Sequence, residues 1–252
     1  SGDIATVTFN RPEVRNAITY GMWRHIPHIV SSLEADERVR VAVIRGAGEK
    51  AFIAGADISQ FEEVRSDMER AQVYNEATIV AMRSLWNCKK PLLAMIHGYC
   101  MGGGCVIAMA CDLRIGAANA RFGIPAAKLG LPYSREAARY LVSAVGPAHA
   151  KLLLFTGRVI DASEAKGMGL LNMVVPEESL EQTTYEIART IASNAPLSVQ
   201  ACKLIINSCL LDPEERNLGE LEEAIRRCFD SKDYKEGVRA FMEKRAPRFE
   251  GR

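Results

Sequence analysis

The sequence predicts an α/β fold in which buried strands alternate with helices. Two apolar runs, at residues 39–45 and 91–97, are short enough for buried strands, and each precedes a glycine-containing loop and then a helical pattern. The chain has 252 residues, of which 48% are apolar. That length can bury a substantial core, either as one large domain or as one domain with an appendage.

The first elements follow from periodicity and from residues that end it. Apolar and polar residues alternate over residues 4–9, as in a half-buried strand, and Asn10-Arg11-Pro12 ends that pattern. A helical pattern runs from about Thr19 to Leu33. Because proline cannot donate a backbone hydrogen bond, Pro27 predicts a kink or a restart inside this helix.

Short strands and helices continue through the middle of the chain. Residues 112–116 and 171–176 are predicted as strands, the second ended by a proline. Gly146 ends one helical pattern, Pro147 can open the next, and Asp161 is suited to cap a further helix. Because helices separate most of the strands, we expect right-handed βαβ units.

The last third of the sequence differs from the rest. From Glu177 onward the pattern is almost entirely helical, with interruptions near Pro196 and Pro213. We therefore predict two parts: an α/β core over residues 1–190 and a helical C-terminal region over residues 191–252. The helices of the second part are expected to pack on the first.

Composition argues against several classes of protein. The 32 basic and 31 acidic residues nearly balance, so we expect neither nucleic acid nor an anionic membrane as a partner. No apolar run reaches the ~18 residues that a membrane-spanning helix needs. Seven cysteines without a C-x-x-C pair favour buried thiols in a reducing compartment, which predicts a cytoplasmic protein.

The glycine run at residues 102–104 carries the strongest chemical signal. It lies between an apolar run and a helical pattern. Glycine lets the backbone approach a ligand closely, and a helix N-terminus offers unpaired N–H groups that can stabilise an oxyanion. A tight turn that packs a strand on a helix explains the glycines equally well. Residues 51–58 have the same setting, so two loops could direct two N–H groups at one oxygen.

Other reactive residues are less well placed for chemistry. Cys100 and Cys105 flank the glycine run, but a catalytic thiol needs an activating partner, and only His97 is near in sequence. Structural thiols are therefore the favoured interpretation. His25 and His28 can share one helix face without a third ligand, so no metal site is expected.

Six motifs, in order and spacing, resemble those of the crotonase (enoyl-CoA hydratase/isomerase) superfamily across nearly the whole chain. They lie at residues 9–17, 51–58, 98–112, 121–125, 155–157 and 236–245. The resemblance implies a crotonase-type ββα spiral core with a helical C-terminal part, assembled as a homotrimer or as a hexamer of two trimers. It also implies an enzyme of fatty acid metabolism that acts on an acyl-CoA. Coenzyme A is then part of the substrate, and no separate cofactor is expected.

The resemblance assigns roles to the two loops. In this superfamily two loops bind the thioester oxygen, and the donors carried onto this chain are the backbone N–H groups of Ala56 and Gly103. An enolate or a tetrahedral oxyanion places charge on that oxygen. Two preorganised donors stabilise that charge, each typically by ~3 kcal/mol.

Contacts with coenzyme A are implied at two places. Phe241 and Lys244 match a C-terminal pair that reaches CoA across a subunit boundary, although a lysine can also be a solvated surface charge. Asp57 can either contact CoA or hydrogen-bond its own loop. The adenine is expected along the first loop, at Ala54, Ala56, Asp57 and Ile58.

One departure from the superfamily bears directly on the reaction. Hydratases of this superfamily carry two glutamates that act as general acid and base on a water molecule. The matching positions hold Val106 and Ala126. Neither side chain can transfer a proton, so the two-glutamate hydration mechanism cannot run, whereas the oxyanion hole is retained.

A replacement for the glutamates is expected in residues 129–136. Tyr133 belongs to a Leu-Gly-x-Pro-Tyr pattern similar to that of decarboxylases that act on malonyl-type CoA thioesters, although those enzymes carry histidine at the position of Ala56. Tyr133 is therefore predicted to be catalytic. Ser134 is either the N-cap of the next helix or a catalytic group. Glu136 either complements the helix dipole or takes part in catalysis.

Two functions stay open on the sequence. The first is an acyl-CoA thioester-processing lyase or isomerase that stabilises an oxyanion or enolate, with decarboxylation or another lyase reaction favoured over hydration. The alternative is a catalytically degenerate acyl-CoA-binding or structural subunit that retained the fold after losing both glutamates.

Overall fold

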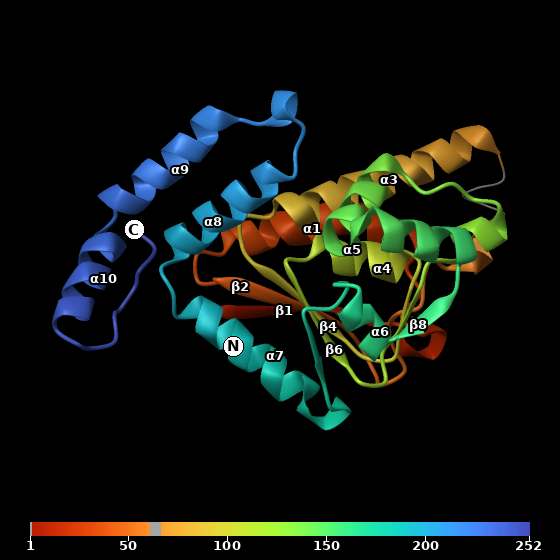
Figure 1. Cartoon of the computed structure of the whole chain (residues 1–252), viewed down its shortest axis with the longest axis horizontal. Helices are drawn as coiled ribbons and strands as arrows, with labels where there is room; N and C mark the ends of the chain where they lie inside the picture. Colours follow the sequence, from red (N-terminus) through yellow and green to blue (C-terminus); the bar gives the residue numbers. More distant parts are fainter. Residues whose placement is uncertain (1, 61–66) are drawn as a thin grey trace.

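Two β-sheets form the centre of the molecule (Figure 1). The computed structural model describes residues 2–60 and 67–252. Within them, a parallel five-stranded sheet has the order β1 (Ile4–Phe9), β2 (Val41–Gly46), β4 (Leu92–Ile96), β6 (Leu113–Ala117) and β9 (Met173–Val175). The second sheet has the order β3 (Ala51–Ile53), β5 (Tyr99–Met101), β7 (Arg121–Gly123) and β8 (Val159–Asp161), with β8 antiparallel to β7.

The chain winds as a spiral in which each turn adds one strand to each sheet and then a helix. β2 leads into β3, β4 into β5, and β6 into β7. The helices of the spiral are α1 (Tyr20–Ala35), α3 (Met68–Asn87), α4 (Gly103–Ala110) and α5 (Arg135–Thr156). This arrangement confirms the α/β class with a crotonase-type ββα spiral core.

The central strands of the five-stranded sheet, β2, β4 and β6, are mostly buried on both faces. Val41 and Val43 pack in one apolar cluster with α7 (Leu180–Ala192), whereas the alternate residues Ala42 and Ile44 pack in the larger cluster with α1, α3 and α4. Every residue of β4 is buried, as the continuous apolar run predicted. The large cluster lies on the side of the sheet where the two glycine-rich loops meet.

A kink or a restart was predicted at Pro27 and a break at Gly146, and of these the restart at Pro27 is wrong. Helix α1 runs from Tyr20 to Ala35 without a restart at Pro27. The proline removes one hydrogen bond, while the buried side chains Trp23, Ile26 and Val30 hold both halves of the helix on the core. The break at Gly146 is confirmed, because its φ of 72° interrupts α5 just before Pro147.

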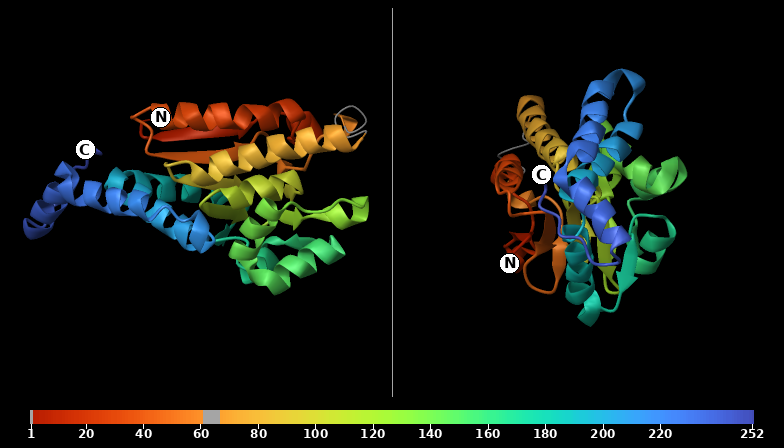
Figure 2. Two further views of the ribbon diagram at one scale, coloured as in Figure 1. Left: turned by 90° about the horizontal axis from the view of Figure 1, so that it is seen from above. Right: turned by 90° about the vertical axis from the view of Figure 1, so that its left-hand side faces the viewer.

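The C-terminal helices extend away from the two sheets. Helix α8 (Pro196–Cys209) packs beside the core, and α9 (Leu218–Asp230) and α10 (Lys232–Met242) continue to one side of it (Figures 1 and 2). Lys203 of α8 is buried, and its Nζ donates to Asp112 Oδ2 at 2.8 Å and to the carbonyl oxygen of Lys90 at 3.1 Å. Removing one member of so buried a pair typically costs several kcal/mol, so this contact fixes α8 on the core.

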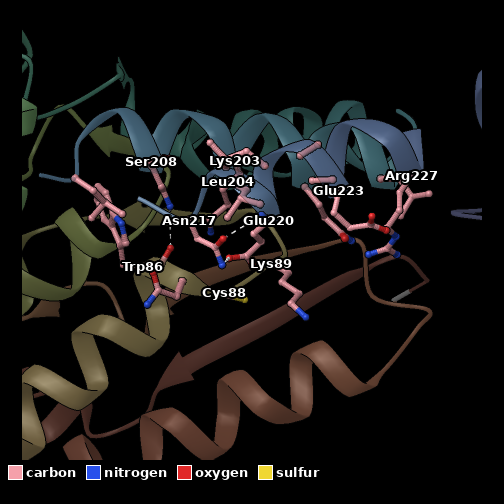
Figure 3. Close-up of a pocket in the computed structure, with 18 of the residues that line it drawn as sticks. Trp86, Cys88, Lys89, Lys203, Leu204, Ser208, Asn217, Glu220, Glu223 and Arg227 are labelled. Carbon is pink, nitrogen blue, oxygen red and sulfur yellow. Dashed lines mark hydrogen bonds between the residues drawn. The ribbon is translucent and has the colours of Figure 1, made fainter. Parts of the chain in front are cut away.

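A cavity of about 480 Å³ lies between the end of α3 and helices α8 and α9 (Figure 3). Its lining includes Trp86, Cys88, Lys203 and Glu220. None of the site residues predicted from the sequence lines this space. Ala54, Ala56, Ile58, Gly103 and Tyr133 instead line a smaller cavity beside the middle of α3.

Candidate active site

The two glycine-rich loops are held in contact by the close approach of α4 to β3. An added Cβ on Gly104 would lie only 2.3 Å from the carbonyl oxygen of Ile53. Gly102 has a φ of 46°, and its N–H donates to the carbonyl oxygen of Gly123 at 2.8 Å. Gly55, in the first loop, has a φ of 113°. Only glycine adopts such conformations readily, so these residues set the relative position of the loops.

Each loop contains a backbone N–H, on Ala56 in the first and on Gly103 in the second, for which the described residues provide no acceptor. Ile18 brackets the first loop, because its N–H donates to the Gly55 oxygen and its own oxygen accepts from Asp57, both at 2.9 Å. These two hydrogen bonds use the residues before and after Ala56 and leave the Ala56 N–H out. Gly103 is the first residue of α4, where an N–H has no acceptor within the helix. Among the described residues, neither of these two donors has a protein acceptor.

Both loops line a cavity of about 250 Å³ beneath α3 and the start of α5. Ile58, 73% exposed, and Leu129, 60% exposed, lie at its open end. Among the described residues, no carboxylate, ammonium, guanidinium or imidazole lines it. Its polar side chains are uncharged: Tyr74, Asn75, Thr78, Tyr133 and Ser134. A charge that develops inside would therefore meet few partners beyond the two N–H groups.

The two positions at which the family resemblance led us to expect glutamates face this cavity. Val106 lies one turn into α4, and Ala126 lies in the short helix Pro125–Leu129, and both line the space. They are apolar side chains on walls where general acid–base chemistry would need carboxylates. The cavity therefore combines two backbone N–H groups that have no acceptor among the described residues with described walls that hold no carboxylate.

Tyr133 lines the same cavity, and its hydroxyl group has an unusual environment. Its hydroxyl is buried and has no hydrogen-bond partner within the described residues. Burial raises the pKa of this phenol well above its usual value, so the hydroxyl stays protonated and can donate a hydrogen bond. A buried polar group without a partner is costly to a fold, and a bound ligand can supply the missing acceptor.

The neighbours of Tyr133 have structural contacts. Ser134 is the N-cap of α5, and its hydroxyl oxygen accepts from the N–H of Ala137 at 3.2 Å. Glu136 pairs with Arg83 at 2.5 Å. Although partial burial opposes ionisation, the helix N–H and Arg83 hold the pKa of Glu136 below its usual value. Glu136 is thus engaged on α3 and does not line the cavity.

Comparison with known proteins decides the family. The family model for enoyl-CoA hydratase/isomerase matches residues 1–252. The chain belongs to the enoyl-CoA hydratase/isomerase family. The superfamily that the sequence motifs resemble is thereby confirmed, and the family is one of enzymes.

Relatives in this family match at full length. A short-chain-enoyl-CoA hydratase of Clostridium acetobutylicum is 38% identical, over 97% of this chain and 93% of its own. An (E)-benzylidenesuccinyl-CoA hydratase of Thauera aromatica is 37% identical, over 100% of this chain and 97% of its own. A crystal structure of an enoyl-CoA hydratase/carnithine racemase from Magnetospirillum magneticum superimposes with a TM-score of 0.95 at 37% identity, covering 100% of this chain and 94% of that one.

In this family member an ion pair between Arg11 and Asp57 holds the first loop, residues 54–58, in place. Asp57 accepts from Arg11 at 2.8 Å and from the hydroxyl of Ser59 at 2.6 Å. These contacts lower the pKa of Asp57, Ser59 contributing most and Arg11 next. Ala54 and Ile58 lie on the same loop and line the cavity. The described contacts of Asp57 therefore order the loop that carries Ala56.

The C-terminal pair lies far from the cavity of its own chain. Phe241, 83% exposed, is on α10, and Lys244 follows that helix with a φ of 55°. Helix α10 is at one end of the molecule, whereas α5 and β8 lie toward the other (Figure 1). A contact between this pair and a ligand at the two loops therefore requires a second copy of the chain.

The cysteines near the glycine loop have the environment of structural thiols. Cys100 and Cys105 are buried, and the thiol of Cys105 donates to the carbonyl oxygen of Cys100 at 3.0 Å. Burial, and next the neighbouring Cys105, raise the pKa of Cys100 well above its usual value. Such a thiol is a poor nucleophile.

No cluster of three or more potential metal ligands occurs among the described residues. No helix in those residues is long and apolar enough to cross a bilayer.

Sequence reasoning missed the inner wall of the cavity. Trp23 comes from α1, and Tyr74, Ile79 and Met82 come from α3. Apolar periodicity marks such residues as buried, but it gives no sign that they face a ligand space rather than one another.

Proposed function

We propose that this chain is an acyl-CoA thioester-processing enzyme that stabilises an enolate and acts as a decarboxylase or another lyase rather than as a hydratase. The observation that carries the proposal is the pairing of two unused N–H groups, on Ala56 and Gly103, with a cavity whose described walls hold no carboxylate. Such a site stabilises negative charge on a thioester oxygen without supplying the acid and base that water addition needs.

Decarboxylation suits these walls. The bond between the α-carbon and the substrate carboxylate breaks, its electron pair forms the enolate, and CO₂ leaves. Charge thereby moves from a carboxylate among apolar side chains to the oxygen that faces Ala56 and Gly103. Tyr133 donates a hydrogen bond that orients the carboxylate, and a proton from solvent then completes the product at the α-carbon.

The alternative is an acyl-CoA-binding or structural subunit without turnover, and the loss of both glutamates favours it equally. A panel of acyl-CoA thioesters, including malonyl-type thioesters, separates the two. Products are read by mass spectrometry, and binding is measured in parallel. A product lighter than its malonyl-type thioester by about 44 mass units, the mass of one CO₂, supports the proposal. Binding without any turnover across the panel supports the alternative.

Crotonyl-CoA hydration is expected to be very weak in the parent protein, because each general acid or base commonly contributes roughly 10²–10⁴-fold. Val106→Glu combined with Ala126→Glu puts both carboxylates on the cavity walls and is expected to raise hydration at least about fivefold. The absorbance of the enoyl thioester measures the rate. Val142→Glu, at an exposed position of α5, is the matched control and is expected to leave hydration unchanged.

A parent rate typical of good hydratases, on the order of 10²–10³ per second, would contradict this prediction. It would place the acid and base outside the positions of Val106 and Ala126.

The distance of α10 from the cavity supports a shared site. We propose a homotrimer, or a hexamer of two trimers, in which Phe241 and Lys244 of one copy reach the CoA bound by another. Sedimentation equilibrium at micromolar concentration is expected to show a trimer or a hexamer, and a monomer would count against the shared site.

All seven cysteines are unpaired, which supports the cytoplasm as the proposed location.

A further inference from the structure

The cavity at the two loops is open at one end and closed at the other. Its outer lining includes Ile58 and Leu129, which are strongly exposed. Its inner lining includes Trp23, Tyr74 and Met82, which are 1%, 3% and 0% exposed. A thioester that enters past the exposed residues therefore directs its acyl tail at these three buried side chains.

Trp23 is the most firmly fixed part of this inner wall. Its indole N–H donates to the hydroxyl oxygen of Tyr74 at 2.8 Å, and both residues are buried. Tyr74 in turn stacks on Tyr20, with ring centroids 5.9 Å apart. The hydrogen bond joins α1 to α3 across the cavity end, so the indole cannot swing aside without leaving a buried donor unpaired.

Trp23 also lies directly against the oxyanion loop. A Cβ built on Gly103 would approach Cζ2 of Trp23 to 3.1 Å, which is tighter than most real contacts. The indole therefore stands next to the N–H that is proposed to hold the thioester oxygen. An acyl tail bonded to the carbonyl carbon of that thioester therefore starts close to the ring.

We infer that Trp23 limits the length of the acyl group, so that this chain accepts short, apolar acyl tails and excludes long ones. The inference rests on the proposed function, because it assumes that a thioester occupies the cavity. The volume of about 250 Å³ is below the ~300–1,000 Å³ usual for drug-sized ligands. Because no charged side chain lines the described walls, the inner end suits hydrocarbon rather than a second carboxylate.

The chain offers a direct binding readout because it holds only two tryptophans, Trp23 and Trp86. Trp86 lines the other cavity (Figure 3). Its ring stacks on that of Tyr140, with centroids 4.3 Å apart. Trp86→Phe keeps an aromatic ring there and leaves Trp23 as the sole indole. Butyryl-CoA and octanoyl-CoA, which are saturated and carry no carboxylate to lose, then report binding without chemistry.

In the Trp86→Phe protein we expect butyryl-CoA to change the fluorescence emission of Trp23. Calorimetry is expected to show that octanoyl-CoA binds at least about tenfold more weakly than butyryl-CoA, because one well-placed pocket wall discriminates between ligands by roughly 10–200-fold. Adding Trp23→Leu is expected to bring the two dissociation constants within about threefold. Trp23→Phe, which removes less volume, should give an intermediate ratio and keeps the test available if the leucine variant does not fold.

The possible failures are distinguishable. If octanoyl-CoA binds the Trp23-containing protein as tightly as butyryl-CoA, or if neither Trp23 variant shifts the ratio, Trp23 does not limit the acyl group, while the proposed function stands. If no CoA thioester binds the Trp86→Phe protein or the parent, the proposed function and this inference both fall. Far-UV circular dichroism and melting curves verify that each variant is folded.

Discussion

Replacing Gly104 with alanine is expected to lower turnover by about 10²–10³-fold, the typical effect of losing one oxyanion-hole donor. Gly104 carries no catalytic group, and its side of α4 faces β3. An added methyl group would lie 2.3 Å from the carbonyl oxygen of Ile53 and 3.1 Å from its carbonyl carbon. Backbone atoms cannot yield as a flexible side chain can, so α4 and β3 must separate.

That separation acts on the site because one donor lies on α4 and the other on the loop that follows β3. Ala56 follows β3 by three residues, and Gly103 begins α4. Donors that no longer converge on one oxygen stabilise the enolate less, whereas contacts with the rest of the thioester persist. We therefore expect the affinity for the thioester to fall less than tenfold, which assigns the loss chiefly to the transition state.

The free energy of unfolding of Gly104→Ala is also expected to fall by roughly 1–3 kcal/mol, because the added methyl group overpacks the contact between α4 and β3. Gly219→Ala is the matched control, because Gly219 lies in α9 and an added Cβ would meet its nearest atom, Oδ1 of Asn217, at an ordinary 3.7 Å. That substitution should leave turnover unchanged and alter stability by at most ~1 kcal/mol. Parental turnover in Gly104→Ala, measured on the substrate that the thioester panel identifies, would contradict the proposed oxyanion hole.

The sequence predicted the large sheet and the loops better than the small sheet. Strands such as β4 are continuous apolar runs bounded by glycine or proline, and that signal is local. The strands of the second sheet, β3, β5, β7 and β8, have three residues each, which is less than two periods of strand alternation. Their pairing depends on the spiral bringing them together and not on any pattern within them.

Pro27 shows a similar limit for helices. Its effect on the backbone is local and favours a restart, but the burial of Trp23, Ile26 and Val30 decides the outcome. Tertiary packing cannot be read from a helical pattern of fifteen residues, so the uninterrupted α1 was not foreseen.

In the candidate site, too, the local features could be predicted from the sequence and the long-range contacts could not. The glycine run and the departures at Val106 and Ala126 are visible as residue types. The structure brings Gly102 and Gly103 of that run to one cavity with Val106 and Ala126. The hydrogen bond between Trp23 and Tyr74 joins residues 51 positions apart. Such a contact has no signature in a single sequence, and neither does the buried, unpartnered hydroxyl of Tyr133.

That hydroxyl makes Tyr133→Phe the most informative single-atom change. The variant keeps the ring that packs against the core and removes only the oxygen. If Tyr133 donates a hydrogen bond to the reacting thioester, turnover should fall at least about tenfold, equivalent to ~1.4 kcal/mol of barrier. Binding of the CoA thioester should change little, because the contact gains most of its strength as the substrate reacts.

The melting temperature separates this role from a structural one. A tyrosine whose hydroxyl stabilises the fold loses stability on replacement by phenylalanine. Here the hydroxyl is buried without a partner among the described residues, so its removal should leave the melting temperature unchanged or raise it. Tyr140→Phe is the matched control, because Tyr140 lies on α5 and stacks on Trp86. This variant should keep parental turnover. Unchanged turnover in Tyr133→Phe would make Tyr133 a packing residue, and the decarboxylase proposal would lose its main support.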